Sequence, residues 1–219
     1  RVLFRSNAMK PLQLLLAVTL IAAFHFNANA QRNIRVGIRA GLNASTTSSG
    51  FGTGTSFKDP NYRMGSAWGL LVNIPLVAKL SFQPELNLSS EGSVQDGQAI
   101  GAASGSYTQI FELKTRYLNI PFMVQYKGNA KGIFLEAGPQ LSTLLKSTLL
   151  TKIAIAGFPA ETDVKNTFNS SVISAAIGGG FNFTKGIGLG VRYTFGLSNA
   201  SEEPEIRSST VFIGLHVKM

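Results

Sequence analysis

Two histidines and no cysteine limit the chemistry open to this chain. Zinc-type sites need several nitrogen and sulfur ligands, and both disulfides and thiol catalysis need cysteine. His25 lies in an apolar segment near the start of the chain, and His216 lies close to its end. We therefore predict no metal, no cofactor and no catalytic residue.

Charged residues within apolar stretches are the second group that could do chemistry. They are Arg39, Glu85, Glu136, Arg192 and Lys218. A buried charge needs a partner of opposite sign, so we expect the two carboxylates to pair with the three cations. Such a network could line a gated polar path, or it could be a salt-bridged plug that fixes the register of the surrounding strands.

The remaining acids gather in polar segments. The densest run is Glu202-Glu203-Pro204-Glu205, which could bind a cation or a basic partner but has the composition of a solvated loop. Glycine-rich runs at 178–180 and 186–190 do not indicate a nucleotide site, because no helical pattern follows them. The other acids of these segments are Asp59, Glu91, Asp96, Glu161 and Asp163.

The first 30 residues have the pattern of a secretory signal. Met9-Lys10 looks like the natural start, residues 12–26 are uncharged and mainly apolar, and Ala28-Asn29-Ala30 fits a small-x-small cleavage site. The apolar run is shorter than the roughly 20 residues of a membrane-spanning helix. We expect residues 1–30 to be upstream sequence plus a cleaved signal peptide, and residues 31–219 to form one domain.

Cleavage at this site would remove Arg1, Arg5 and Lys10 and lower the formal charge from +9 to +6. The remaining basic residues are scattered along the chain. Nucleic-acid binding needs them clustered on one face, so we expect no nucleic-acid partner.

Most of the chain after residue 31 alternates with the period of a β-strand. Apolar side chains such as Ile38, Leu70, Val124 and Leu215 occupy one face, and small or polar residues occupy the other. Long helical periodicity is absent. The eight predicted strands are residues 34–45, 62–74, 78–90, 110–126, 132–146, 171–183, 186–197 and 208–219.

Short and long connections alternate between these strands. Outer-membrane barrels alternate in this way, with short periplasmic turns, longer external loops and an even number of strands. Because lipid cannot satisfy backbone hydrogen bonds, spanning strands must close into a ring. The sequence therefore predicts an all-β fold, an eight-stranded antiparallel up-and-down transmembrane β-barrel with a polar lumen. The short connections lie at 75–77, 127–131 and 184–186, and the long ones at 46–61, 91–109, 147–170 and 198–207.

Two details of the barrel concern side chains near the strand ends. Glu112, Lys114 and Arg116 share the parity of the lipid-facing Leu118, so either that strand rises clear of the membrane or a bulge switches its faces. Aromatic side chains are expected to form girdles at the level of the lipid headgroups. They are Trp68, Tyr117, Tyr126, Phe134, Phe181, Phe183, Tyr193 and Phe195.

Five motifs follow one another in chain order. They are Gly37-Ile38-Arg39-Ala40-Gly41-Leu42-Asn43, Phe82-Gln83-Pro84-Glu85-Leu86, Tyr117-Leu118-Asn119-Ile120-Pro121, Leu135-Glu136-Ala137-Gly138-Pro139 and Gly190-Val191-Arg192-Tyr193. Together they resemble the PorT-like outer-membrane β-barrel family, which is common in Bacteroidetes. The resemblance spans about the whole mature chain and implies a transmembrane eight-stranded barrel of the bacterial outer membrane, without implying a particular activity. Many outer-membrane barrels end on an aromatic residue, whereas this chain ends on Met219.

Three functional classes fit these observations. The first, which we favour, is a barrel with a plugged lumen that has a structural or interaction role through its external loops. The second is a narrow pore or an accessory to secretion or transport, and the third is a soluble lipocalin-like barrel that binds lipid. We expect a monomer in contact with outer-membrane lipid, whose extracellular or periplasmic protein partners the sequence does not identify. Enzymatic activity is not expected, because His216 should lie near the periplasmic rim, away from the external loops.

Overall fold

A computed structural model describes residues 34–48, 59–101, 105–128, 132–153, 160–201 and 206–219. The expected signal segment and the acidic run at 202–205 lie outside the described residues. Within the described part the chain forms nine strands and one short 3-10 helix. They are β1 (Arg35–Thr47), β2 (Asn61–Pro75), β3 (Leu80–Gly101), β4 (Gly105–Lys127), β5 (Ile133–Ile153), β6 (Ala160–Asp163), η2 (Lys165–Thr167), β7 (Ser171–Asn182), β8 (Ile187–Gly196) and β9 (Ser208–Lys218).

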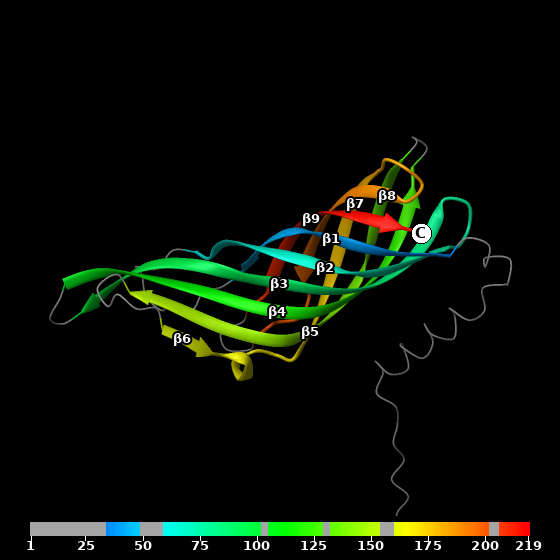
Figure 1. Ribbon diagram of the computed structural model, residues 1–219. Coiled ribbons are helices and arrows are strands. Elements are labelled where there is room, and N and C mark those ends of the chain that lie inside the picture. Colours follow the sequence, from blue (N-terminus) through cyan, green and yellow to red (C-terminus); the bar gives the residue numbers. More distant parts are fainter. Residues whose placement is uncertain (1–33, 49–58, 102–104, 129–131, 154–159, 202–205) are drawn as a thin grey trace, which may run out of the picture.

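Eight of these strands close into a ring, as predicted. Each pairs antiparallel with its neighbours along the chain, β9 pairs with β1, and β4 pairs with β5. The short strand β6 pairs with β5 outside this ring, in the connection to β7. Figure 1 shows the closed barrel with β6 beside the far end of β5. The eight predicted strands correspond to β1–β5 and β7–β9.

The barrel is inverted relative to a soluble protein. Outward side chains such as Ile38, Leu70 and Leu135 are apolar and 54–60% exposed, whereas the inward Gln83 and Glu136 are at most 3% exposed. Exposed apolar faces on nearly every strand match the lipid-facing surface of a membrane barrel. The soluble lipocalin-like alternative is therefore wrong, because its apolar face would have to point inward. No helix among the described residues is long and apolar enough to cross a membrane.

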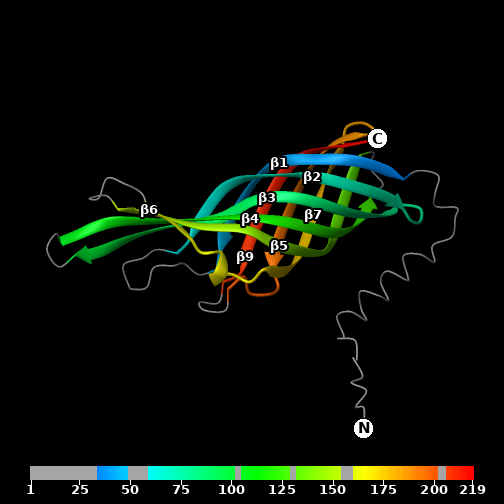
Figure 2. The same cartoon turned by 60° about the horizontal axis from the view of Figure 1, so that its bottom comes forward.

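The two ends of the barrel differ. One end, called here the short-turn end, carries the connections β2–β3, β4–β5 and β7–β8 together with the chain terminus after Lys218. The opposite end, called here the loop end, carries the other connections. Past the rim of the barrel at this end, β3, β4 and β5 continue as a projecting blade, which is seen most clearly in Figure 2.

This blade corrects two of the predicted loops. Residues 91–109 were expected to be a loop, but β3 and β4 stay paired from Leu80↔Tyr126 to Gly101↔Gly105. Part of the expected loop 147–170 is likewise strand, because β5 runs on to Ile153 and pairs with β6. The apolar alternation that marks a lipid-facing strand ends near the rim, and a strand surrounded by water does not need it.

Of the two expected explanations for Glu112, Lys114 and Arg116, the extension of β4 past the rim applies, and a switch of its faces by a bulge does not. β4 keeps its faces, and these three residues continue outward above Leu118. The bulge lies in β5, because Arg116 pairs with Lys146 whereas Tyr117 pairs with Leu144, which leaves Leu145 as the extra residue.

The predicted aromatic girdle needs a correction at two positions. Tyr117 and Phe134 point into the lumen and are 5% and 1% exposed. Each has the parity of inward neighbours, Asn119 and Glu136 respectively, so the pleat of the strand overrides the position near a strand end. The other six aromatic residues of the predicted girdle face outward.

Substitution of Leu70 tests the inverted arrangement. Leu70 lies in the outward apolar run of β2, and we expect Leu70→Arg to destabilise the barrel in lipid vesicles by about 2–4 kcal/mol. The measurement is urea unfolding of vesicle-embedded protein. The control is Ser66→Arg on the same strand and face but nearer the loop end, where the cost should be roughly 0–1 kcal/mol. An equally small effect at both positions would contradict a lipid-facing Leu70.

Candidate functional site in the lumen

Four of the five charged residues singled out in the sequence meet in the middle of the lumen. Arg39 comes from β1, Glu85 from β3, Glu136 from β5 and Arg192 from β8, and each alternates with outward apolar residues. All four are at most 5% exposed. We call these four residues the charge quartet.

Arg192 is held by both carboxylates of the quartet. Its Nη1 and Nη2 donate to Glu85 Oε2 and Oε1 at 2.9 and 2.8 Å, and its Nε donates to Glu136 Oε1 at 2.8 Å. The planar guanidinium is suited to this two-pronged geometry. Three strands, β3, β5 and β8, are thereby joined across the lumen by one side chain.

Arg39 completes the quartet from the other side. Its two terminal nitrogens donate to Glu136 at 3.2 and 3.3 Å, and Nη1 lies 3.4 Å from Glu85 Oε1. Two cations and two anions give the quartet a formal charge of zero. A neutral, fully paired cluster meets the condition under which charges can be buried away from water.

Amide side chains bind the oxygen atoms of the quartet. Gln83 Nε2 donates to Glu85 Oε1 at 2.7 Å, Asn87 Nδ2 donates to Glu85 Oε2 at 2.9 Å, and Gln125 Nε2 donates to Glu136 Oε2 at 2.8 Å. Gln83 and Asn87 lie two residues on either side of Glu85 on β3, and Gln125 lies directly opposite Glu136 in the register of β4 and β5. Their inward parity is visible in the sequence, but a pattern of charged residues does not include them.

Lys218, the fifth charged residue, lies outside the quartet toward the short-turn end. Its Nζ is 3.4 Å from Gln125 Oε1 and lies over the ring of Phe134, 5.7 Å from its centre. Among the ion pairs of the described residues none includes Lys218. Lys218 therefore reaches the carboxylates only indirectly, through Gln125.

His216 also lies in the lumen near the short-turn end. Its Nε2 is 2.9 Å from Asn182 Oδ1, and its ring packs edge-on against Phe134. The described residues contain no group of three or more His, Cys, Asp or Glu side chains that could hold a metal ion.

A second polar layer lies between the quartet and the loop end. Glu91 was assigned from the sequence to an external loop, but it is an inward residue of β3 and is 9% exposed. It accepts hydrogen bonds from Ser89 at 2.6 Å, from Asn119 at 3.3 Å and from Thr210 at 3.2 Å. A cavity of about 40 Å³ lies between this layer and the quartet, which is room for roughly three water molecules.

Above the Glu91 layer, apolar side chains fill the loop end of the lumen. We call them the loop-end apolar cluster. Strand residues and residues of the long connections both contribute, and all seven are at most 6% exposed. From the short-turn end to the loop end, the lumen therefore contains mixed polar and aromatic side chains, the charge quartet, a small cavity, the Glu91 layer and an apolar layer. The cluster consists of Leu113, Tyr117, Leu144, Phe168, Val172, Ala200 and Ile206.

The comparison with family models agrees with this architecture. The family model described as outer membrane protein beta-barrel domain matches residues 27–202. No curated protein matches the sequence. Several solved structures are similar to this chain at low identity. Neisserial surface protein A is 11% identical, with 86% of this chain and 100% of that chain covered and a TM-score of 0.49. Ail of Yersinia pestis is 10% identical, with coverage of 85% and 99% and a TM-score of 0.48. The outer membrane protease OmpT of Escherichia coli is 9% identical, with coverage of 86% and 97% and a TM-score of 0.46.

Removal of one carboxylate tests the quartet. Glu136→Gln leaves two buried arginines facing a single carboxylate, and breaking a buried ion pair on one side costs about 3–5 kcal/mol. We expect a loss of that size in the free energy of unfolding, measured in vesicles with urea. The control is Glu161→Gln on the exposed strand β6, which should change stability by no more than about 0.5 kcal/mol. Equal effects at the two positions would refute a paired quartet.

Proposed function

The chain belongs to the outer membrane protein β-barrel domain family, and we propose that it serves as a closed, non-conducting barrel with a structural and interaction role outside the membrane. The observation that carries this proposal is the filled lumen. The charge quartet spans the middle of the barrel, and the loop-end apolar cluster fills the lumen above it. An eight-stranded barrel is about wide enough for its interior to be filled by side chains.

The blade supports the interaction role. β4 is 23 residues long, whereas a strand needs about 9–11 residues to cross the hydrocarbon core. The outward apolar run of β4 ends at Leu118, and the strand continues toward the loop end for a similar length beyond it. We propose that this paired, water-exposed sheet presents the surface through which the barrel meets extracellular partners.

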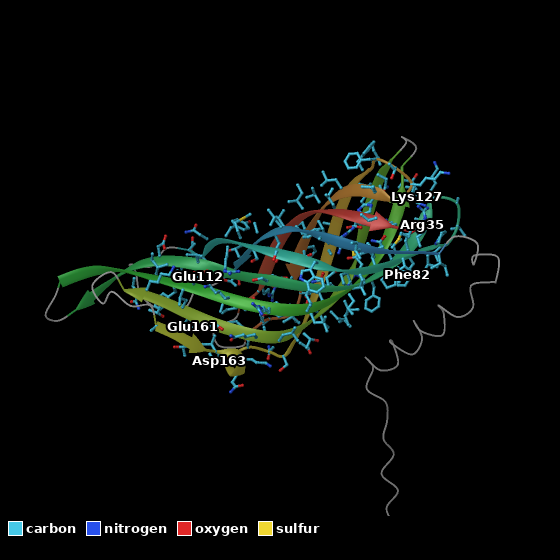
Figure 3. The ribbon with its side chains drawn as sticks, in the orientation of Figure 1. Arg35, Phe82, Glu112, Lys127, Glu161 and Asp163 are labelled. Atoms are coloured by element: carbon cyan, nitrogen blue, oxygen red, sulfur yellow. The ribbon has the colours of Figure 1, made fainter. Side chains whose placement is uncertain are left out.

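A catalytic role is not part of the proposal. His216 lies at the short-turn end of the lumen with Asn182 as its hydrogen-bond partner, away from the blade and the long connections. The acids of β6, Glu161 and Asp163, are exposed and are seen along the edge of the blade in Figure 3. We propose that the barrel acts as a monomer through its external surface, without a cofactor.

Planar-bilayer recording separates this proposal from a narrow pore. We expect inserted protein to give no stepwise current, because side chains fill the lumen at two levels. Insertion is verified on the same sample by resistance of the folded band to cold SDS. The control is protein denatured before addition, which shows whether residual detergent produces current steps. Discrete steps that depend on folded protein would favour the pore.

A further inference from the structure

Basic side chains gather on the outer surface of β4 and β5, from the level of Arg116 outward along the blade. Arg116 and Lys146 lie directly opposite each other in the register of the two strands. Lys114 lies two residues further along the same face of β4, and Lys152 lies beyond it on β5. We call these four residues the basic band.

Among the described residues a single carboxylate, Glu112, serves the basic band, and it is shared. Glu112 lies 3.1 Å from Arg63 Nε, 3.7 Å from Lys114 Nζ and 3.8 Å from Lys152 Nζ. Among the described residues no ion pair includes Arg116 or Lys146. Like charges placed directly opposite each other across two strands destabilise a sheet. The stability of the sheet therefore does not explain why Arg116 and Lys146 face each other.

The side chain of Arg63 reaches Glu112 by crossing the intervening strand β3 at a glycine. Its side chain passes over Gly92 of β3, which has φ of +147°, and its Nη1 donates to Ser90 Oγ at 3.3 Å. A Cβ at Gly92 would lie 1.9 Å from the carbonyl oxygen of Leu113 and 3.2 Å from Arg63 Cδ. Glycine thus permits a third cation to bind Glu112, which leaves less of this carboxylate for the basic band.

The acids of β6 do not neutralise the basic band. Asp163 pairs in register with Thr148, and its Oδ1 accepts a hydrogen bond from the backbone N–H of Lys165 at 2.9 Å. Glu161 pairs with Leu150. No ion pair joins either acid to the basic band within the described residues. Figure 3 labels Glu112 at the start of the blade, and Glu161 and Asp163 on β6, which is separated from β4 by β5.

The position of the basic band along the strands, relative to the outward apolar residues, indicates which part of the lipid it contacts. Below Arg116, the outward residues of β4 from Leu118 to Tyr126 are mainly apolar and span nine positions, the length that crosses the hydrocarbon core. On β5 the last outward apolar residue below Lys146 is Leu145, which is 44% exposed. The basic band therefore begins where the hydrocarbon region ends, at the level of the lipid headgroups on the loop-end side.

We propose that the basic band is a binding site for the phosphate groups of lipid headgroups in the leaflet at the loop end. Arg116 and Lys146 are the central ligands, with Lys114 at the margin, whereas Lys152 lies six residues further out along β5. Arginine suits phosphate through paired N–H donors, and lysine supplies a point charge. A phosphate bound between Arg116 and Lys146 neutralises the like-charge contact that the bare protein leaves uncompensated. The site adjoins the apolar outer surface of the barrel, where the acyl chains of a lipid can lie. A lipid headgroup should therefore bind better than a free anion.

Native mass spectrometry of the refolded full chain in detergent, titrated with bisphosphorylated lipid A, tests this site. We expect the unmodified chain to retain lipid. Arg116→Gln combined with Lys146→Gln should weaken retention roughly thirtyfold, because each basic residue near a charged lipid surface strengthens binding by a factor of roughly five to six. Lipid A lacking both phosphates should bind the two proteins equally and weakly. Both substituted positions are exposed on the outer face, and cold-SDS resistance verifies that the variant is folded.

The matched control removes the same charge at the other end of the barrel. Lys127→Gln combined with Lys185→Gln, at two short-turn connections, should leave retention unchanged. Equal losses in the two double variants, or retention that does not depend on the lipid phosphates, would overturn the proposal. Complete displacement of lipid by inorganic phosphate would also overturn it, because the site would then recognise a free anion and not a headgroup.

Discussion

Every part of this structure depends on the fact that lipid offers no hydrogen-bond partner to a backbone N–H or C=O group. A strand that crosses the membrane must pair on both sides, so the sheet has to close. The pairing of β9 with β1 and of β4 with β5 supplies that closure. The constraint ends at the membrane surface, where water can bind the backbone. It is there that the sheet opens and β3, β4 and β5 leave the ring as a blade.

Closure places polar side chains in a narrow interior, and the charge quartet shows how that interior is stabilised. Glu85 and Glu136 each bind both arginines, and neighbouring amides bind the same carboxylates. Because the quartet joins β1, β3, β5 and β8, a shift of one strand by one residue would break several contacts at once. The interaction that fills the lumen therefore also favours a single register.

The sequence predicted the parts that follow from a two-residue period, and it did not predict the parts that depend on closure in three dimensions. Ring order, strand faces and the alternation of short and long connections all follow from alternation and turn residues. The blade was missed because outside lipid a strand does not need a row of apolar outward residues, as at Glu91 to Gln95, where only Val94 is apolar. The inward Tyr117 and Phe134 were assigned to a girdle by residue type, although their parity placed them in the lumen. The loop-end apolar cluster combines residues far apart in the chain, such as Leu113 and Ile206, and no local pattern shows that they meet.

The most direct test of the closed membrane barrel is a gel of residues 31–219 refolded into detergent micelles, with boiled and unboiled samples run beside each other. A fully paired ring that needs an apolar surrounding should resist cold SDS and migrate as a compact band that shifts on boiling. A parallel sample diluted into buffer without detergent should not give this band. A chain that folds in plain buffer and shows no detergent-dependent band would contradict the account.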